Sequence, residues 1–421
     1  MAYLKYKNIM ILKLSLLAII LIAPQLASAV PAFARQTGMS CRSCHFQNFP
    51  ALNTFGRVFR SQGYTMANPN RLIAGDDLSL PLTLNASIIT KLRYQLSENA
   101  KGSRGEVQWP DEAALLVGGR AGEKVGFLME LGLGPQEGEG TVTLDEDSDG
   151  DGVADTGHVT SDVTGNFLST KFIFNVADTF SVIPFSTDGL GVGYGFELLN
   201  TGVQRSQRPI ENRSGYSAYQ ALGLASGAAT GIALAYNNNN NLFINYSHWA
   251  PTFGNVNANI AGGLGHYLRV AYMPNIAGWD TGFGATSYSG TIESGENDPP
   301  TETKLGGYGV DFQAQGAVSD MPLGIYLSYG TAEKDTWVNN GADDASAFGF
   351  VVKADINPGD VDETTAYLGY LSIDDGSSSD NADTTIGVQH MVAQNIKLEL
   401  YNVSRNNDRD GYTMLMLFAG F

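Results

Sequence analysis

The strongest constraint on the fold is an alternation of apolar and polar residues that begins near residue 80 and continues to the end of the chain. In 124–133, every second residue from Val125 to Leu133 is apolar, while Lys124 and Glu130 fall on the opposite face. This part has no unbroken apolar run of spanning length and no convincing long amphipathic helix. Because only helices and closed barrels satisfy every backbone group in lipid, insertion of this part into a membrane requires a β-barrel.

Sixteen segments of this kind can be counted, and bacterial single-chain barrels require such an even number. They are expected near 82–94, 112–120, 124–134, 166–177, 180–199, 216–236, 242–250, 264–273, 279–289, 304–317, 322–331, 346–355, 363–373, 383–392, 396–404 and 411–421. The fifth and sixth are the least regular. The sequence therefore predicts an all-β fold, a transmembrane β-barrel of about sixteen antiparallel strands.

The connections between these segments alternate in length. Short turns follow every second strand, at Ala121–Glu123, Asn237–Asn241, Asn275–Ile276 and Ala393–Asn395. Longer connections lie between them, at 95–111, 135–165, 251–263 and 290–303. Outer-membrane barrels have short periplasmic turns and long extracellular loops, and a last strand that ends in Phe421 suits barrel closure. A secreted β-sandwich or a solenoid is the alternative, although no repeat of fixed period supports a solenoid.

The composition also fits a membrane barrel. Of the 421 residues only 16% are charged and 50 are glycine, whereas average proteins have about 25% charged residues and about 7% glycine. The formal net charge of −18 argues against a nucleic-acid partner, because nucleic acids are normally met by a basic surface. The outer surface of the barrel is therefore expected to contact outer-membrane lipid.

Residues 1–29 are expected to be a signal peptide. After a positively charged start, 14–22 form an apolar stretch that Lys13 keeps shorter than the roughly 20 residues of a membrane anchor. The small residues at 27–29 favour cleavage there, with a cut after Ala34 as the alternative. Cleavage at the first place removes three lysines and no acid, so the net charge becomes −21. The mature protein is then exported from the cytoplasm.

The two cysteines of the chain stand in the sequence Cys41-Arg-Ser-Cys44-His45, which is the C-x-x-C-H pattern of c-type haem attachment. Thiols three positions apart can reach the two vinyl groups of one haem, and the adjacent histidine can bind the iron as the proximal ligand. A redox dithiol and a plain disulfide are the alternatives for the cysteines. A zinc site would require a second ligand pair, which does not follow.

A short helix is expected after this motif. Pro50 suits its first turn, Leu52, Phe55 and Phe59 recur at helical spacing, and Gly63 is well placed to end it. Two arginines fall elsewhere on the same helix. They can either pair with haem propionates or be solvated.

The second axial ligand of the haem iron is less defined by the sequence. Met66 is the nearest suitable thioether, since Met39 lies too close to the covalent anchor. A His/Met pair raises the reduction potential relative to other ligand sets. A distal histidine, an open iron position, and a role for Met66 in the core are the alternatives.

A calcium loop is a further prediction. The 135–165 connection contains nine acids and no Lys or Arg, and Asp147, Asp149, Asp151 and Asp155 occupy positions 1, 3, 5 and 9 of an EF-hand-like pattern. Position 12 is His158 instead of the bidentate glutamate, which argues against a true EF-hand. The alternative is an acidic, solvated loop.

His248 and His266 fall at the ends of neighbouring predicted strands, on the same rim of the barrel. They share parity with apolar residues, so they are expected to face lipid headgroups. A metal-binding pair is a weaker alternative.

The sequences FARQTGMSCRSCH at 33–45, FPALNTFGR at 49–57 and GY at 63–64 resemble the fused outer-membrane cytochrome–porins of iron-oxidising bacteria. The specific resemblance covers 33–66, and the rest agrees in length, architecture and strand pattern. It implies a haem held by Cys41 and Cys44, with His45 as the proximal ligand. Beside the predicted signal peptide at 1–29, it implies a monohaem cytochrome segment at 30–75 that plugs the barrel and a porin-like barrel at 76–421.

The function implied by this resemblance is electron transfer across the outer membrane. Extracellular Fe(II) would be the donor, a periplasmic cytochrome the acceptor, and the activity that of an iron-oxidising oxidoreductase. One covalently bound c-type haem would do the redox chemistry. Two alternatives stay open: a diffusion porin whose haem segment is structural or sensory, and electron export to an external acceptor.

Overall fold

The structure is a computed structural model, and the residues that it describes are 32–74, 79–82, 84–97, 105–133, 168–187, 197–202, 209–211, 217–224, 229–238, 241–253, 257–258, 263–294, 301–336, 339, 343–358, 362–375, 380–407 and 409–421. The predicted signal peptide 1–29 and the predicted calcium loop around 147–155 lie outside these residues. Among the described helices, none is long and apolar enough to cross a membrane.

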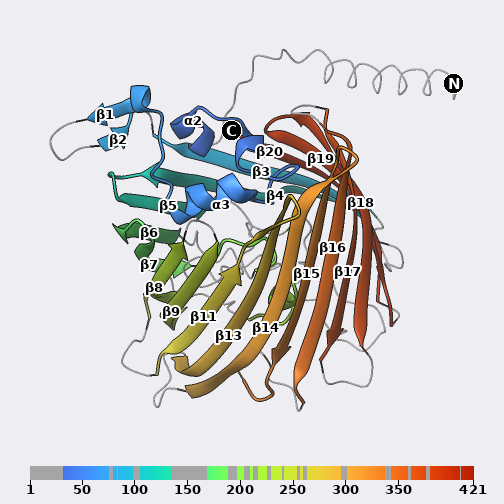
Figure 1. Ribbon diagram of the computed structural model, residues 1–421. Helices are drawn as coiled ribbons and strands as arrows, with labels where there is room; N and C mark the ends of the chain where they lie inside the picture. Colours follow the sequence, from blue (N-terminus) through green and yellow to red (C-terminus); the bar gives the residue numbers. More distant parts are fainter. Residues whose placement is uncertain are drawn as a thin grey trace, which may run out of the picture.

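The main body is a closed antiparallel β-barrel (Figure 1). In the described part of the chain, sixteen strands form its wall in chain order, and the last pairs with the first. They are β3 (Ala86–Ser97), β4 (Gly105–Arg120), β5 (Val125–Gly132), β6 (Leu168–Ala177), β7 (Phe180–Thr187), β8 (Ala229–Asn238), β9 (Leu242–Phe253), β11 (Gly265–Tyr272), β13 (Trp279–Ser294), β14 (Thr301–Val318), β15 (Met321–Ala332), β16 (Ala345–Asn357), β17 (Thr364–Asp374), β18 (Asn381–Ala393), β19 (Ile396–Arg405) and β20 (Tyr412–Gly420). The two-residue strands β10 (Asn257–Ala258) and β12 (Asn275–Ile276) pair with β9 and β13.

Each of the sixteen predicted segments overlaps one of these strands, so the barrel prediction is confirmed. The connection predicted at 95–111 is shorter than expected, because β3 continues to Ser97 and β4 begins at Gly105. The fifth and sixth segments were predicted too long. The strand predicted at 180–199 ends at Thr187, and the strand predicted at 216–236 begins only at Ala229. Described residues of this excess, such as Leu198, Leu199 and Tyr219, are completely buried without being part of the wall.

The two ends of the barrel differ as the sequence predicted. One end carries short connections such as Ser319–Asp320 between β14 and β15, and we call it the short-turn end. The other carries the long connections and is called the long-loop end. The barrel closes antiparallel between β20 and β3, and Ile88 and Phe421 exchange two backbone hydrogen bonds there, at 2.8 and 3.0 Å. By the usual orientation of such barrels, the short-turn end faces the periplasm.

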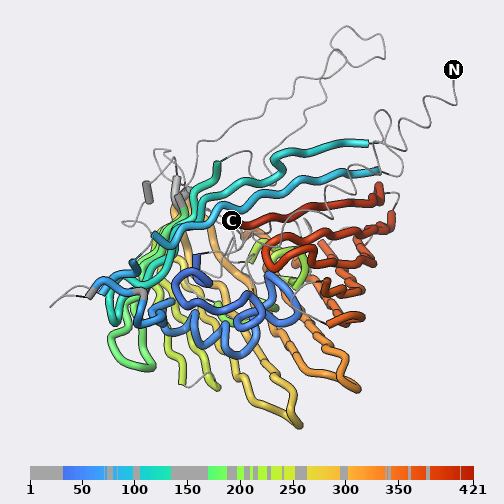
Figure 2. Tube along the Cα trace, turned by 90° about the horizontal axis from the view of Figure 1, so that it is seen from above, coloured from blue at the N-terminus to red at the C-terminus, as the bar shows by residue number. Residues whose placement is uncertain are grey.

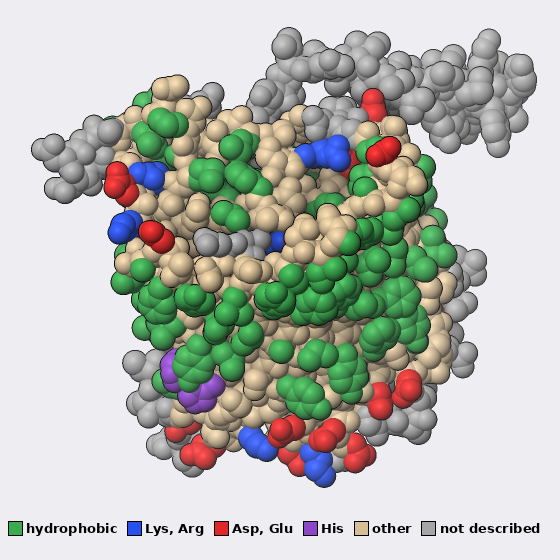
Figure 3. All heavy atoms as spheres, viewed as in Figure 1, with side chains coloured by type: hydrophobic (Ala, Val, Ile, Leu, Met, Phe, Trp, Pro, Cys, Tyr) green, Lys and Arg blue, Asp and Glu red, His purple; other side chains and the backbone are tan. Residues whose placement is uncertain are grey.

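The wall is apolar outside and polar inside. In β16, Phe348 points outward and is 40% exposed, whereas Lys353 points inward and is completely buried. On the face seen in Figure 3, hydrophobic side chains gather in a band across the middle, and charged side chains lie above and below it. A closed antiparallel barrel with such a band spans the outer membrane of a Gram-negative bacterium.

The N-terminal segment, residues 32–66, lies across the short-turn end of the barrel and is called the plug (Figure 2). It contains helix α2 (Ala32–Thr37), the short 3₁₀ helix η1 (Cys41–Ser43) and helix α3 (Thr54–Ser61). A second 3₁₀ turn, η2 (Pro69–Arg71), and a two-stranded sheet of β1 (Leu72–Ala74) and β2 (Ser79–Pro81) follow. The small N-terminal helical segment was therefore predicted correctly.

The helix predicted after the haem motif begins later than expected. Its N-cap is Asn53, whose side chain accepts a hydrogen bond from the Gly56 N–H at 2.9 Å, so Pro50 precedes the helix. Gly63 follows the end of the helix with a φ of +67°, as the sequence predicted.

A second segment enters the lumen from the connection between β7 and β8. Its described parts are 197–202, 209–211 and 217–224, and they include helix α4 (Ala218–Ala221). Glu197 pairs at 2.8 Å with Arg269 of the wall, and both side chains are completely buried. The Tyr219 hydroxyl donates at 2.8 Å to Asp311, which also pairs with Arg269. This charged cluster fixes the segment to the wall and fills this part of the barrel.

Candidate functional site: the Cys41–His45 turn and the pocket beside it

The haem motif forms a compact turn in the plug. The backbone N–H groups of Cys44 and His45 both donate to the Cys41 carbonyl, at 3.1 and 3.0 Å. Both cysteines are half-buried. Burial and the neighbouring Cys41 raise the pKa of the Cys44 thiol to about 11. The turn keeps the two thiols and the imidazole close together, as attachment of one haem would require.

The orientation of His45 is fixed by the segment that follows it. The ring Nδ1 lies 3.1 Å from the Ala51 carbonyl, so this nitrogen donates and Nε2 is the nitrogen that can bind a metal. Burial lowers the pKa of His45 to about 4, which keeps the imidazole neutral. The backbone of His45 also forms an antiparallel bridge with Leu52. A neutral, oriented imidazole is what a proximal iron ligand must be.

Helix α3 supports the turn from behind. Besides capping α3, Asn53 donates through its side-chain amide to the carbonyls of Arg42 and Ser43, at 3.2 and 3.1 Å. Gly56 packs against the Cys44 carbonyl so closely that an added Cβ would overlap it. The first turn of α3 and the haem motif thus form one packed unit.

The barrel wall holds this unit at several points. Gln47 donates through its side-chain amide to the carbonyls of Pro322 and Lys353, each at 3.2 Å. Lys397 donates to the Phe49 carbonyl at 3.1 Å, and the Phe49 ring stacks on Phe418 with centroids 5.1 Å apart. Strands far apart in sequence therefore contact one short loop of the plug.

The two arginines of α3 are buried, so the alternative in which they are solvated is wrong. Arg57 is completely buried and pairs with Asp280 at the start of β13, at 2.5 Å. Thr54 donates to the other oxygen of the same carboxylate at 2.6 Å. Arg60 is 6% exposed. The alternative, in which the arginines meet haem propionates, stays a prediction.

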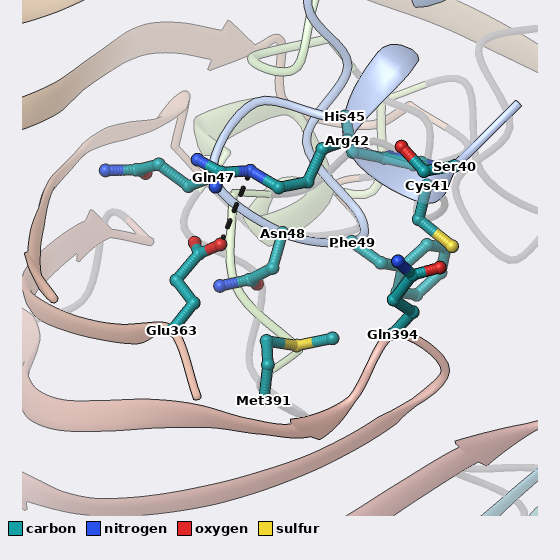
Figure 4. Close-up of a pocket in the computed structure, with 10 residues that line it drawn as sticks. All are labelled: Ser40, Cys41, Arg42, His45, Gln47, Asn48, Phe49, Glu363, Met391 and Gln394. Carbon is teal, nitrogen blue, oxygen red and sulfur yellow. Dashed lines mark ion pairs between the residues drawn. The ribbon is translucent and has the colours of Figure 1, made fainter. Parts of the chain in front are cut away.

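A pocket opens between the haem motif and the barrel wall (Figure 4). Its lining residues are Ser40, Cys41, Arg42, His45, Gln47, Asn48, Phe49, Glu363, Met391 and Gln394. Arg42 pairs across it with Glu363 at 3.5 Å. Burial and the nearby Asp355 carboxylate raise the pKa of Glu363 to about 7. The pocket is thus bounded on one side by the plug and on the other by the short-turn ends of the strands.

The donor residues present match those of a covalently attached haem. Two thiols and an imidazole with its Nδ1 held by a carbonyl are the donor set of a c-type site. The thiols can supply the covalent links and the free ring nitrogen the proximal ligand. The haem, the division into 30–75 and 76–421, and the ligand roles stay predictions.

Met66, the distal ligand predicted from the sequence, lies away from this pocket. It is partly buried and packs against the cluster that contains Phe59 and Tyr64, and its carbonyl accepts a hydrogen bond from the Gln36 side chain at 2.6 Å. It does not line the pocket beside Cys41 and His45. Its role as an iron ligand stays a prediction.

His248 and His266 are brought together as expected. They are direct partners across β9 and β11, with ring centroids 4.7 Å apart, and His266 Nδ1 lies 3.0 Å from the Tyr246 hydroxyl. The His248 side chain is exposed and that of His266 is half-buried. Among the described residues, no group of three or more His, Cys, Asp or Glu side chains could hold a metal ion. Metal binding by the pair stays a prediction.

The sequence alone did not identify Glu363, Met391 or Gln394 as neighbours of the haem motif. They lie more than 300 residues further along the chain, and only the closure of the barrel brings them to the plug. Their position could have been predicted from the short turns beside them, because the short turns lie at the same end of the barrel as the N-terminal segment.

The chain is distantly similar to several solved structures. No family model matches the chain, and no curated protein matches it. Among solved structures, OprB of Pseudomonas putida is 10% identical with a TM-score of 0.48 over 80% of this chain and 93% of that one. Pseudomonas aeruginosa OpdK with vanillate is 9% identical (TM-score 0.45, 80% and 98% covered), and a loop-deletion mutant of Vibrio cholerae OmpT is 13% identical (0.44, 80% and 99%). With these low scores, the assignment of the barrel rests on the strand pairing of this chain itself.

Proposed function

We propose that this protein is a haem-bearing outer-membrane electron-transfer protein that oxidises extracellular Fe(II) and passes the electrons to a periplasmic carrier. The observation that carries the proposal is the Cys41–His45 turn, in which the imidazole is held through Nδ1 by the Ala51 carbonyl. When bound there, a haem would supply reversible one-electron chemistry at the iron. Iron as the donor comes from the sequence resemblance.

The protein residues would attach and position the cofactor. Cys41 and Cys44 would provide the thioether links, and His45 Nε2 the proximal ligand. The Ala51 carbonyl would increase the basicity of the imidazole by accepting its Nδ1 proton, because such partners orient and tune metal ligands. The packing of α3 behind the turn would keep these groups rigid.

The place of the turn in the barrel supports electron hand-over on the periplasmic side. The plug lies at the short-turn end and is held by Gln47 and by the carboxylate of Asp280. The net charge of −18 favours cations near the protein as a general field effect.

The first test is a spectrum of the purified protein in detergent without oxygen. We expect covalently bound haem in the wild type, none in Cys41→Ser/Cys44→Ser, and a reduced-haem spectrum when Fe(II) is added to the oxidised protein. Haem that is present but stays oxidised at substrate-level iron would rule out iron oxidation. A measured potential too low to accept electrons from Fe(II) would favour electron export.

A diffusion porin with a structural or sensory haem segment is the second candidate. The polar inner wall favours it, since Lys91, Arg93 and Glu399 point inward as they would in an aqueous channel. Against it, these side chains are buried, and the plug and the 197–224 segment occupy the lumen. Planar-bilayer recordings separate the candidates: electron transfer through a plugged barrel predicts almost no ion conductance, and the porin predicts steady open-channel currents.

A further inference from the structure

Strand β18 directs one methionine toward the plug. Along this strand, Thr385, Gln389 and Met391 point inward and are buried, whereas Ile386 points outward and is 65% exposed. Met391 is 8% exposed and lies near the short-turn end of the strand. The alternation of the strand therefore places its thioether on the side of the barrel that the plug occupies.

The backbone around Met391 is irregular and firmly held. The register between β18 and β19 shifts between Met391 and Ala393. Met391 N–H donates to the Glu363 carbonyl, and the Met391 carbonyl accepts from the Asp362 N–H, both at 2.9 Å. Bulges of this kind often lie next to functional sites, because they change the direction of a side chain.

Met391 and the haem motif share one pocket. Its side chain lines the same cavity as Cys41 and His45, and Figure 4 shows it reaching into the space below the plug loop. Of the other lining groups on the barrel wall, Glu363 pairs with Arg42, and Gln394 offers an amide. Of the three residues that the barrel wall contributes to the pocket lining, Met391 is the one with a sulfur donor. A methionine thioether is a common haem-iron ligand opposite histidine.

We propose that Met391 of the barrel wall, and not Met66 of the plug, is the distal ligand of the haem iron. This inference rests on the proposed haem attachment and adds to it the second axial ligand. It makes the site a joint one, with the covalent links and the proximal ligand on the plug and the distal ligand on β18. Docking of the plug would then set the ligand pair, and with it the reduction potential.

The test is Met391→Leu in the full-length protein, with Met66→Leu as the matched control. Leucine approximates the volume of methionine, so the packing of the barrel should change little. In the wild type we expect the weak long-wavelength charge-transfer band of ferric haem with a sulfur ligand, and the strongly upfield methyl resonance of a bound methionine in the reduced state. Both should vanish in Met391→Leu, which should also gain binding of carbon monoxide and a lower potential. Both should persist in Met66→Leu.

Three results would overturn the inference. The two methionine signals could be lost in Met66→Leu, could persist in Met391→Leu, or could be absent from the haem-loaded wild type. Met391→His provides a second variant, which should show the spectrum of a bis-histidine haem if position 391 faces the iron. Absence of covalent haem from the wild type would remove the proposed function itself, and a haem stain on a denaturing gel distinguishes that result from the others. Heat-dependent gel mobility shows in each case that the barrel has folded.

Discussion

At the residue scale, the Cys41–His45 turn packs closely against the segment that follows it and against helix α3. His45 is held by the Ala51 carbonyl, and Asn53 contacts both α3 and the carbonyls of Arg42 and Ser43. These contacts run within a segment of about a dozen residues, so the local sequence is sufficient to shape the turn. Gly56 is the point at which helix and turn approach each other most closely.

Gly56→Ala should therefore disturb the haem motif. Its Cβ would overlap the Cys44 carbonyl, which is backbone and cannot rotate away, so helix and turn must separate. We expect at least a severalfold loss of covalently bound haem per barrel, measured by haem stain against total protein. Gly122→Ala is the control, because its Cβ would meet only Val125 at 3.9 Å. Equal haem content in both variants would contradict the prediction.

At the scale of elements, the contact between α3 and β13 ties the plug to the wall. Asp280 accepts hydrogen bonds from Thr54 and Arg57, and the Arg57 side chain is completely buried. A buried charge that loses its partner is costly. The same argument applies to Arg269, which binds the 197–224 segment through Glu197.

Asp280→Asn should loosen the plug while leaving the barrel closed. The substitution keeps the size of the side chain but leaves the Arg57 charge uncompensated, at a cost of up to about 3 kcal/mol. We expect faster proteolysis of the plug and larger current fluctuations in bilayers than in the wild type. Asp320→Asn, in the exposed turn between β14 and β15, is the control and should change neither. An unaltered plug in Asp280→Asn would show that other contacts hold it.

At the scale of the whole molecule, the two ends of the barrel have different roles. The plug and the short turns lie at one end, and the connection that contains 197–224 enters the lumen from the other. The segments meet inside, where Leu52 N–H donates to the Asn200 side chain at 2.7 Å and the Asn200 amide donates to the Leu52 carbonyl at 3.0 Å. The lumen is therefore occupied from both ends.

Epitope tags can check this orientation. A tag inserted between Ser319 and Asp320 lies at the short-turn end, whereas a tag inserted after Asp335 lies at the long-loop end. On intact cells, antibody should label only the tag after Asp335, because short turns face the periplasm. Permeabilised cells should show both. Labelling of the 319–320 tag on intact cells would reverse the orientation and move the haem motif to the outer surface.

The sequence by itself determined the barrel and the haem motif. Period-two alternation and the alternating connection lengths predicted sixteen strands that each overlap an observed one, since side chains in a barrel wall must alternate between lipid and lumen. The C-x-x-C-H turn was equally visible because its residues are neighbours in the chain. Only the tertiary structure decided that the helix after it begins at Thr54, that the described parts of the β7–β8 connection lie in the lumen, and that Glu363 and Met391 border the motif. These depend on contacts between residues far apart in sequence, which exist only once the barrel closes around the plug.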